Sequence, residues 1–201
     1  MKTIEPNGLP IVNLCGDDYD LNEIAIKADE GDIRSMGMFV NLCMSADRDI
    51  YDKTRNKWFE YIKKLAAMGN TYGYIWMADL YERGDCVKKD IHHAILFFQK
   101  AAEAGEKYGY ECIAKIYYEG RDIEPDYEKA YKYIMKSRKK SGMSYYILGE
   151  LYREGRYVKK NRSRSRLYYR KARGDFSENL DAYAEFAQKR LEGYEGELKI
   201  H

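Results

Sequence analysis

"MADLYERGDCVKKD", residues 77–90, recurs in two further versions along the chain: "IAKIYYEGRDIEPD" at 113–126 and "LGELYREGRYVKKN" at 148–161. In each version a small residue stands second, an aromatic residue fifth, a glycine eighth, an aliphatic residue eleventh, and Asp or Asn last. The glycine returns after 36 and then 35 residues. Self-similarity at this period predicts a stack of helical hairpins.

The first half of each unit has the pattern of a helix with one buried face. In the first unit Tyr74, Met77, Ala78 and Tyr81 fall at helical spacing. The small residue allows a neighbouring helix to approach closely, and the tyrosine that follows fills the space beside it. We expect each helix to stop at a glycine, which accepts the left-handed conformation of a helix C-terminus. These glycines are Gly84, Gly120 and Gly155.

The second half of each unit is predicted to be another helix, starting after the residue that ends the motif. Asp and Asn accept hydrogen bonds from the free N–H groups of a first helical turn. The predicted N-cap residues are Asp90, Asp126 and Asn161. The apolar pattern of this second helix also fits upstream, at Trp58, Tyr61, Ile62 and Leu65. We expect the connection before it, over residues 45–56, to be longer than in the other units.

The repeated unit resembles that of the Sel-one-like repeat (SLR) family, a relative of the tetratricopeptide repeats. The closest matches to the family pattern are the motif at 148–161 and "HAILFFQKAAEAG" at 93–105. The resemblance is strong over 70–174 and weak over 32–69 and 176–193. It implies an all-α fold, a right-handed α/α solenoid of stacked helical hairpins. The second glycine of the family pattern is replaced here, by Cys86, Asp122 and Tyr157.

The chain is expected to form one continuous array over residues 21–193. It has three prolines and no stretch rich in Gly and Ser that would mark a linker between domains. The ends of the array are degenerate, as the ends of helical arrays tend to be. The predicted segments are an irregular N-terminus (1–20), degenerate units (21–69), clear repeats (70–174), a capping helix (176–193) and a tail (194–201).

Composition indicates a soluble protein, since 34% of the 201 residues are charged and 45% are apolar. No run is apolar enough for a signal peptide or a membrane span, so we expect a cytoplasmic location. The cysteines form no C-x-x-C pair and have no regular spacing, which favours free thiols in a reducing compartment over a disulfide framework or zinc site. They are Cys15, Cys43, Cys86 and Cys112.

Catalytic chemistry finds little support in the sequence. His92 and His93 are adjacent and would point about 100° apart on a helix, so they cannot form an i, i+4 metal site. Cys112, near Glu111 and Lys115, is best interpreted as a partly buried helical cysteine. There is no Gly-rich phosphate loop, H-E-x-x-H motif or nucleophile elbow. We therefore expect no enzyme activity, no metal and no cofactor.

Resemblance to tetratricopeptide-like arrays implies that the first helix of each hairpin lines a concave surface. Side chains off its buried stripe would form a groove for a protein or peptide partner, as in an adaptor or regulatory scaffold. Tyr and Arg are enriched in such interfaces because they supply large contact areas. The predicted groove residues are Tyr72, Ile75, Asp79, Glu82, Arg83, Tyr108, Glu111, Lys115, Tyr118, Glu119, Met143, Tyr146, Glu150, Arg153 and Glu154.

A net charge of +2 conceals a basic segment. Residues 131–173 carry 15 Lys and Arg against 2 Asp and Glu, whereas residues 1–130 carry 17 against 24 and residues 174–201 carry 3 against 7. Residues 136–173 of this segment are either a solvated convex surface or a binding site for an acidic protein or nucleic acid, although no recognisable nucleic-acid module accompanies them. Its densest basic residues are Lys159, Lys160, Arg162, Arg164, Arg166 and Arg170.

One more class of function stays open at this point. A small array without an attached domain also suits an inhibitor or immunity protein that binds and blocks a toxin or enzyme. The sequence does not choose between this role and that of an adaptor, and it does not define an oligomeric state.

Overall fold

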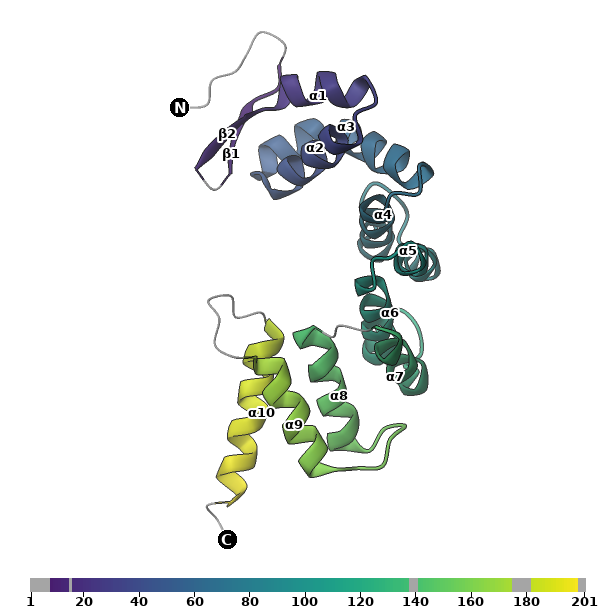
Figure 1. Ribbon diagram of the computed structural model, residues 1–201, viewed down its shortest axis with the longest axis vertical. Coiled ribbons are helices and arrows are strands. Elements are labelled where there is room, and N and C mark those ends of the chain that lie inside the picture. Colours follow the sequence, from purple (N-terminus) through teal and green to yellow (C-terminus); the bar gives the residue numbers. More distant parts are fainter. Residues whose placement is uncertain (1–7, 15, 138–140, 175–181, 199–201) are drawn as a thin grey trace. The chain divides into compact units, whose positions relative to one another are not determined.

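A computed structural model describes residues 8–14, 16–137, 141–174 and 182–198, with side chains up to residue 194 (Figure 1). The chain divides into two compact units, Met1–Gly105 and Glu106–His201. Each unit is built from antiparallel helical hairpins.

The first unit begins with a strand pair. β1 (Ile11–Leu14) and β2 (Asp17–Asp20) are antiparallel, with Val12 opposite Tyr19. The prediction of an irregular segment over residues 1–20 is therefore wrong for these strands. Val12 is buried in the core of the unit, and its β-branched side chain suits a half-buried strand.

Five helices follow the strands in the first unit. They are α1 (Leu21–Asp29), α2 (Ile33–Ser45), α3 (Arg48–Ala67), α4 (Thr71–Arg83) and α5 (Ile91–Glu103). The predicted long connection over 45–56 is wrong, because α3 begins at Arg48. Asp47 caps it by accepting a hydrogen bond from the backbone N–H of Ile50, at 3.1 Å. The side chains of Ile50 and Thr54 extend the buried stripe upstream of Trp58.

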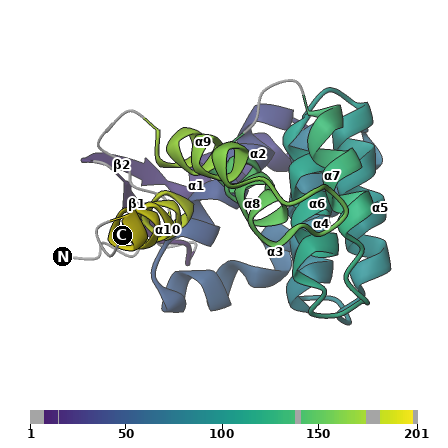
Figure 2. The same cartoon turned by 90° about the horizontal axis from the view of Figure 1, so that it is seen from below.

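The second unit contains five helices within its described residues. They are α6 (Tyr108–Glu119), α7 (Tyr127–Lys136), α8 (Gly142–Glu154), α9 (Arg162–Arg173) and α10 (Ala182–Leu198). Helix α10 packs against α8 and α9, as two views show (Figure 1 and Figure 2). Its buried residues are Ala184, Ala187 and Leu191. The predicted capping helix began at residue 176, but residues 175–181 lie outside the described part of the chain. Its predicted end at residue 193 is wrong, because α10 continues to Leu198 into the segment predicted to be a tail.

The predicted helix boundaries of the repeats are confirmed. The three glycines that end α4, α6 and α8 have left-handed φ angles of 75°, 61° and 75°. The three predicted N-cap residues accept hydrogen bonds from backbone N–H groups in the first turns of α5, α7 and α9. The repeated 14-residue motif therefore specifies both the end of one helix and the start of the next.

The replaced glycine of the family pattern has a conformational consequence. Cys86 and Tyr157 have left-handed φ angles of 60° and 61°, although neither is a glycine, and Asp122 does not. The first and third repeats thus keep the same backbone turn with a side chain added. Residues other than glycine pay a conformational penalty in this region.

Stacked rings and lysines hold the two helices of each repeat together. A ring from the second helix stacks on a tyrosine of the first, and a lysine one turn further on lies over the same ring. The stacked pairs, with centroid distances, are Tyr81–Phe97 (5.7 Å), Tyr117–Tyr133 (6.0 Å) and Tyr152–Tyr168 (5.6 Å). The lysines are Lys100, Lys136 and Lys171. Many of the 21 tyrosines therefore serve the scaffold.

The structure gives the predicted all-α fold of stacked hairpins, apart from the strand pair. Among the described residues, no helix combines the length and apolar character needed to cross a membrane.

Candidate functional site

A hollow of about 360 Å³ opens on the second unit between α6, α8 and α10. Aromatic side chains from all three helices line it, and we call it the aromatic hollow. Four predicted groove residues, Lys115, Tyr118, Glu119 and Tyr146, are among those that it brings together. The complete lining consists of Lys115, Tyr118, Glu119, Arg121, Tyr146, Ile147, Ala182, Tyr183 and Phe186.

Tyr146 is the central ring of the aromatic hollow. Its ring centroid lies 5.8 Å from that of Tyr183 and 5.9 Å from that of Phe186. Behind it lies the buried ring of Tyr169, with centroids 5.9 Å apart. Phe186 remains 46% exposed at the outer edge. Such rings offer a large contact area with few rotatable bonds, which is the property of residues that dominate binding energy at interfaces.

Polar groups surround the rings. Glu119 and Arg121 form an ion pair at the hollow, with Oε2 and Nε 3.2 Å apart. Burial raises the pKa of the Tyr118 hydroxyl, and the nearby Glu150 and Glu154 carboxylates raise it further. Burial also raises the pKa of Tyr183. Both hydroxyls therefore stay protonated near neutral pH and can donate hydrogen bonds to a partner.

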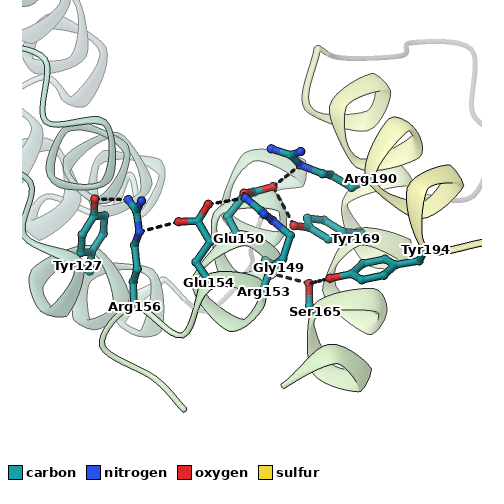
Figure 3. A network of polar contacts seen from close by, with 10 residues as sticks. All are labelled: Tyr127, Gly149, Glu150, Arg153, Glu154, Arg156, Ser165, Tyr169, Arg190 and Tyr194. Carbon is teal, nitrogen blue, oxygen red and sulfur yellow. Dashed lines mark hydrogen bonds and ion pairs between the residues drawn. The ribbon is translucent and has the colours of Figure 1, made fainter. Parts of the chain in front are cut away.

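Glu150 was predicted to face the groove, but its side chain is buried, with only 2% of the residue exposed. Its carboxylate accepts hydrogen bonds from Arg190 Nε at 2.7 Å, Tyr169 Oη at 2.8 Å and Arg153 Nε at 3.1 Å (Figure 3). Burial by itself would raise the pKa of Glu150, but these donors outweigh it and the pKa is lowered. The carboxylate thus joins α8, α9 and α10 beneath the aromatic hollow.

The Glu150 contacts continue along the unit as a chain of ion pairs. Arg153 also binds Glu154, whose other oxygen lies 2.6 Å from Arg156 Nε. Arg156 in turn donates to the hydroxyl of Tyr127 on α7 (Figure 3). Arg153 and Glu154, predicted to bind a partner, are therefore engaged within the unit itself. We call these residues, with Tyr169 and Arg190, the Glu150 network.

Glu111 is a second predicted groove residue that the structure buries, again with 2% exposed. Its carboxylate accepts a hydrogen bond from Ser137 Oγ at 2.8 Å and another from the backbone N–H of Ser141 at 3.1 Å. Met143 is likewise buried, at 5%. First helices in the second unit contact more than one neighbouring helix, so their buried face is wider than a single helical stripe. The helical-wheel prediction missed this second contact.

Predicted groove residues of α4 belong to the first unit. Tyr72 is 60% exposed and its ring lies 6.1 Å from that of Trp76, centroid to centroid. Asp79 and Arg83 form an ion pair one turn apart. The remaining ones, Ile75 and Glu82, are half-buried, and Tyr108 at the start of α6 in the second unit is 48% exposed.

The predicted basic residues do not form one uniform patch. The Arg162 guanidinium lies 5.0 Å from the ring centroid of Tyr194, on α10. Arg164 lies over Tyr152 of α8 and donates a hydrogen bond to its hydroxyl at 3.1 Å. Arg166 is half-buried. Lys159, Lys160 and Arg170 are exposed, and so are Arg162 and Arg164 despite their ring contacts.

Three residues of α10 were missed by the sequence analysis: Tyr183, Phe186 and Arg190. The helix itself was predicted, and its small residue Ala184 is buried. No second helix was predicted to follow α10, so the sequence did not show which side of α10 would be covered by a neighbour. The sequence did carry one signal for these residues. Tyr183 and Phe186 are three positions apart, so a helix places their two large rings on the same side.

Comparison with known proteins identifies the repeats. The Sel1 repeat model matches residues 71–106, 108–136 and 142–173, which are the three hairpins α4–α5, α6–α7 and α8–α9. The chain belongs to the Sel1-like repeat family. A search of curated proteins gave no match.

Solved structures of SLR proteins share this fold. One is c5321, a protective antigen present in uropathogenic Escherichia coli strains, with 21% identity and a TM-score of 0.67 over 78% of this chain and 34% of that one. Another is a Sel1 repeat protein from Oxalobacter formigenes, with 24% identity and a TM-score of 0.63 over 80% of this chain and 67% of that one. This SLR chain thus spans about a third of the length of c5321. The likeness establishes the all-α solenoid fold.

Proposed function

We propose that this SLR protein is a non-catalytic interaction module that binds a protein partner through the aromatic hollow. The observation that carries the proposal is the convergence of four rings, Tyr118, Tyr146, Tyr183 and Phe186, from three helices on one hollow. Sel1 repeat proteins are in general interaction scaffolds, which supports this class of function.

The Glu150 network supports the proposal by holding the rings in place. Tyr146 rests on Tyr169, whose hydroxyl is bound by the Glu150 carboxylate, and Arg190 ties the same carboxylate to α10. A surface fixed before binding loses less conformational entropy when a partner docks. The expected partner inserts a large apolar side chain among the rings. Lys115 and the Glu119–Arg121 pair then orient its polar flanks.

The test uses two exposed apolar residues that differ in location. Phe186 on α10 lines the hollow and is 46% exposed, whereas Leu167 on α9 does not line it and is 49% exposed. Tagged wild-type chain, Phe186→Ala and Leu167→Ala are used to capture partners from the native host, with and without nuclease. Both substitutions remove similar exposed apolar surface, so both variants should stay folded.

The proposal expects one stoichiometric protein that survives nuclease and binds wild type and Leu167→Ala equally. Its recovery should fall about tenfold with Phe186→Ala, the usual effect of losing an interface anchor. Equal capture by all three proteins would contradict the proposal. Capture lost on nuclease treatment would instead favour the basic residues of α9. The identity of the partner would separate an adaptor from an inhibitor or immunity protein.

A further inference from the structure

A second hollow, of about 440 Å³, lies in the first unit between the strand pair, α2 and α4. We call it the N-terminal hollow. Three of its apolar side chains are unusually exposed: Leu14 at 37%, Ile33 at 48% and Tyr72 at 60%. Exposed apolar side chains gathered around one hollow mark interaction sites more often than isolated ones do. The rest of the lining is Tyr19, Arg34, Gly37, Met38, Asn41, Leu42, Leu65, Asn70 and Trp76.

Gly37 lies inside α2, where glycine is among the least favourable residues for a helix. Close packing does not explain its presence. A Cβ atom added at Gly37 would meet only the side chain of Trp76, at 3.9 Å, which is ordinary van der Waals contact. By contrast, a Cβ at Gly73 would come within 2.5 Å of backbone. The effect of glycine at position 37 is to keep the floor of the N-terminal hollow open.

Arg34 is the one charged side chain among the residues that line the N-terminal hollow. It lies in the first turn of α2, where a cation interacts unfavourably with the helix dipole. Within the described residues it makes no ion pair, and its side chain is exposed. Arg34 helps to lower the pKa of the Asp32 carboxylate that caps α2, but the two side chains form no ion pair, so the guanidinium donors stay available to a ligand.

We propose that the N-terminal hollow is a docking site for an acidic peptide segment of a protein partner. A large apolar side chain of the segment enters the hollow, and a neighbouring carboxylate pairs with Arg34. Two lining residues, Gly37 and Arg34, oppose the preferences of their own helix, which is the pattern expected at functional sites. The volume lies within the range of binding pockets. The site is independent of the aromatic hollow in the other unit.

The test is selection of random 12-residue peptides displayed on phage against the full chain. Enriched peptides should carry Asp or Glu beside a large apolar residue. Gly37→Leu fills the hollow and should weaken the selected peptides at least about tenfold, and Gly37→Ala, which adds only one methyl group to the floor, should weaken them less than Gly37→Leu does. Arg34→Gln should weaken them about fivefold or more, because it removes a charged hydrogen-bond donor. Lys88→Gln, at an exposed cation away from the hollow, is the matched control.

Several results would overturn the proposal. They are no enrichment, enrichment of basic peptides, or selected peptides that bind Gly37→Leu and Arg34→Gln as tightly as wild type. If circular dichroism shows that Gly37→Leu does not fold, the exposed Arg34→Glu variant decides alone, since it should abolish binding of acidic peptides. Phe186→Ala in the second unit should leave peptide binding unchanged. Peptides that respond to Phe186→Ala instead would assign the binding to the aromatic hollow.

Discussion

Replacing Gly149 with alanine is expected to destabilise the second unit, although the other two repeats have alanine at the corresponding position. Those alanines, Ala78 and Ala114, are fully buried. At Gly149 an added Cβ would lie 2.5 and 2.6 Å from two ring carbons of Tyr169. Carbon atoms in favourable contact are about 3.5–4.0 Å apart, so the ring would have to move by about 1 Å.

The ring of Tyr169 has little freedom to move. It is 0% exposed, and its hydroxyl donates to Glu150 at 2.8 Å. Overpacking a core costs about 1–3 kcal/mol. The displaced ring also weakens its hydrogen bond to Glu150, which costs part of the roughly 1.5–3 kcal/mol that a hydrogen bond to a charged group contributes in full. Alanine is more favourable than glycine inside a helix by up to about 1 kcal/mol, which offsets part of this loss. We expect a net loss of about 2–3 kcal/mol, or about 4–12 °C in melting temperature for a chain of this size.

A double-mutant cycle tests this reasoning through thermal unfolding followed by circular dichroism. The second substitution is Tyr169→Ile, because isoleucine is the residue at the corresponding position of the preceding repeat, Ile134. In the Tyr169→Ile background, Gly149→Ala should be neutral or slightly stabilising, because the ring that the added Cβ would clash with is no longer present. The coupling free energy between the two sites should be about 3 kcal/mol.

Gly37→Ala is the matched control, because it makes the same change inside a helix without a clash. It should be neutral or stabilising by up to about 1 kcal/mol. Equal costs of Gly149→Ala in the wild-type and Tyr169→Ile backgrounds would refute the steric explanation. Wild-type stability of the single variant would refute it too.

Three further predictions concern the Glu150 network, the replaced glycine and the basic residues. Glu150→Gln should destabilise by about 3 kcal/mol near neutral pH. The pKa of Glu150 is lower in the folded chain than in the unfolded chain, where it is about 4.3. The ionised carboxylate therefore stabilises the fold at pH values above about 4.3, and this stabilisation is lost as the pH falls through the folded pKa. The stability gap to wild type, measured by denaturation at several pH values, should therefore shrink in acid; a gap that grows in acid would contradict this. Tyr157→Gly should change stability by less than about 1 kcal/mol, because relief of the left-handed backbone offsets the lost ring contact, whereas Tyr157→Val should destabilise by about 1–2 kcal/mol. Equal melting temperatures for the two variants would show that the turn is not strained. Replacing Lys159, Lys160 and Arg170 together with Gln should leave protein capture intact, and a steep loss of capture would assign binding to this surface.

Much of the fold could be predicted from the sequence, because the same helix-boundary residues occur in each of the three repeats. The small residue, the stop glycine and the N-cap recur with fixed spacing, so an error in one unit is corrected by the others. Helix α10 and the start of α3 lacked this redundancy. At α3 the segment 48–57 is mostly polar, and its helical start rests on Asp47 and on the two buried side chains Ile50 and Thr54.

The candidate site was predicted only in part. Lys115, Tyr118, Glu119 and Tyr146 do meet at one hollow. Glu111 and Glu150 do not, because each carboxylate is buried by donors from residues 19 to 40 positions away in the sequence. A helical wheel describes one helix against one neighbour. It cannot show that a third helix covers the opposite side and supplies an arginine to a buried acid.

Footprinting by hydroxyl radicals would test the role of the aromatic hollow most directly. The chain is oxidised alone and in complex with its captured partner, and modification is quantified at exposed rings by mass spectrometry. Tyr183 and Phe186 should be protected in the complex, whereas Tyr157, which is 51% exposed and lies outside the hollow, should react equally in both states. Protection confined to residues 157–170, with Tyr183 and Phe186 unchanged, would contradict binding through the aromatic hollow.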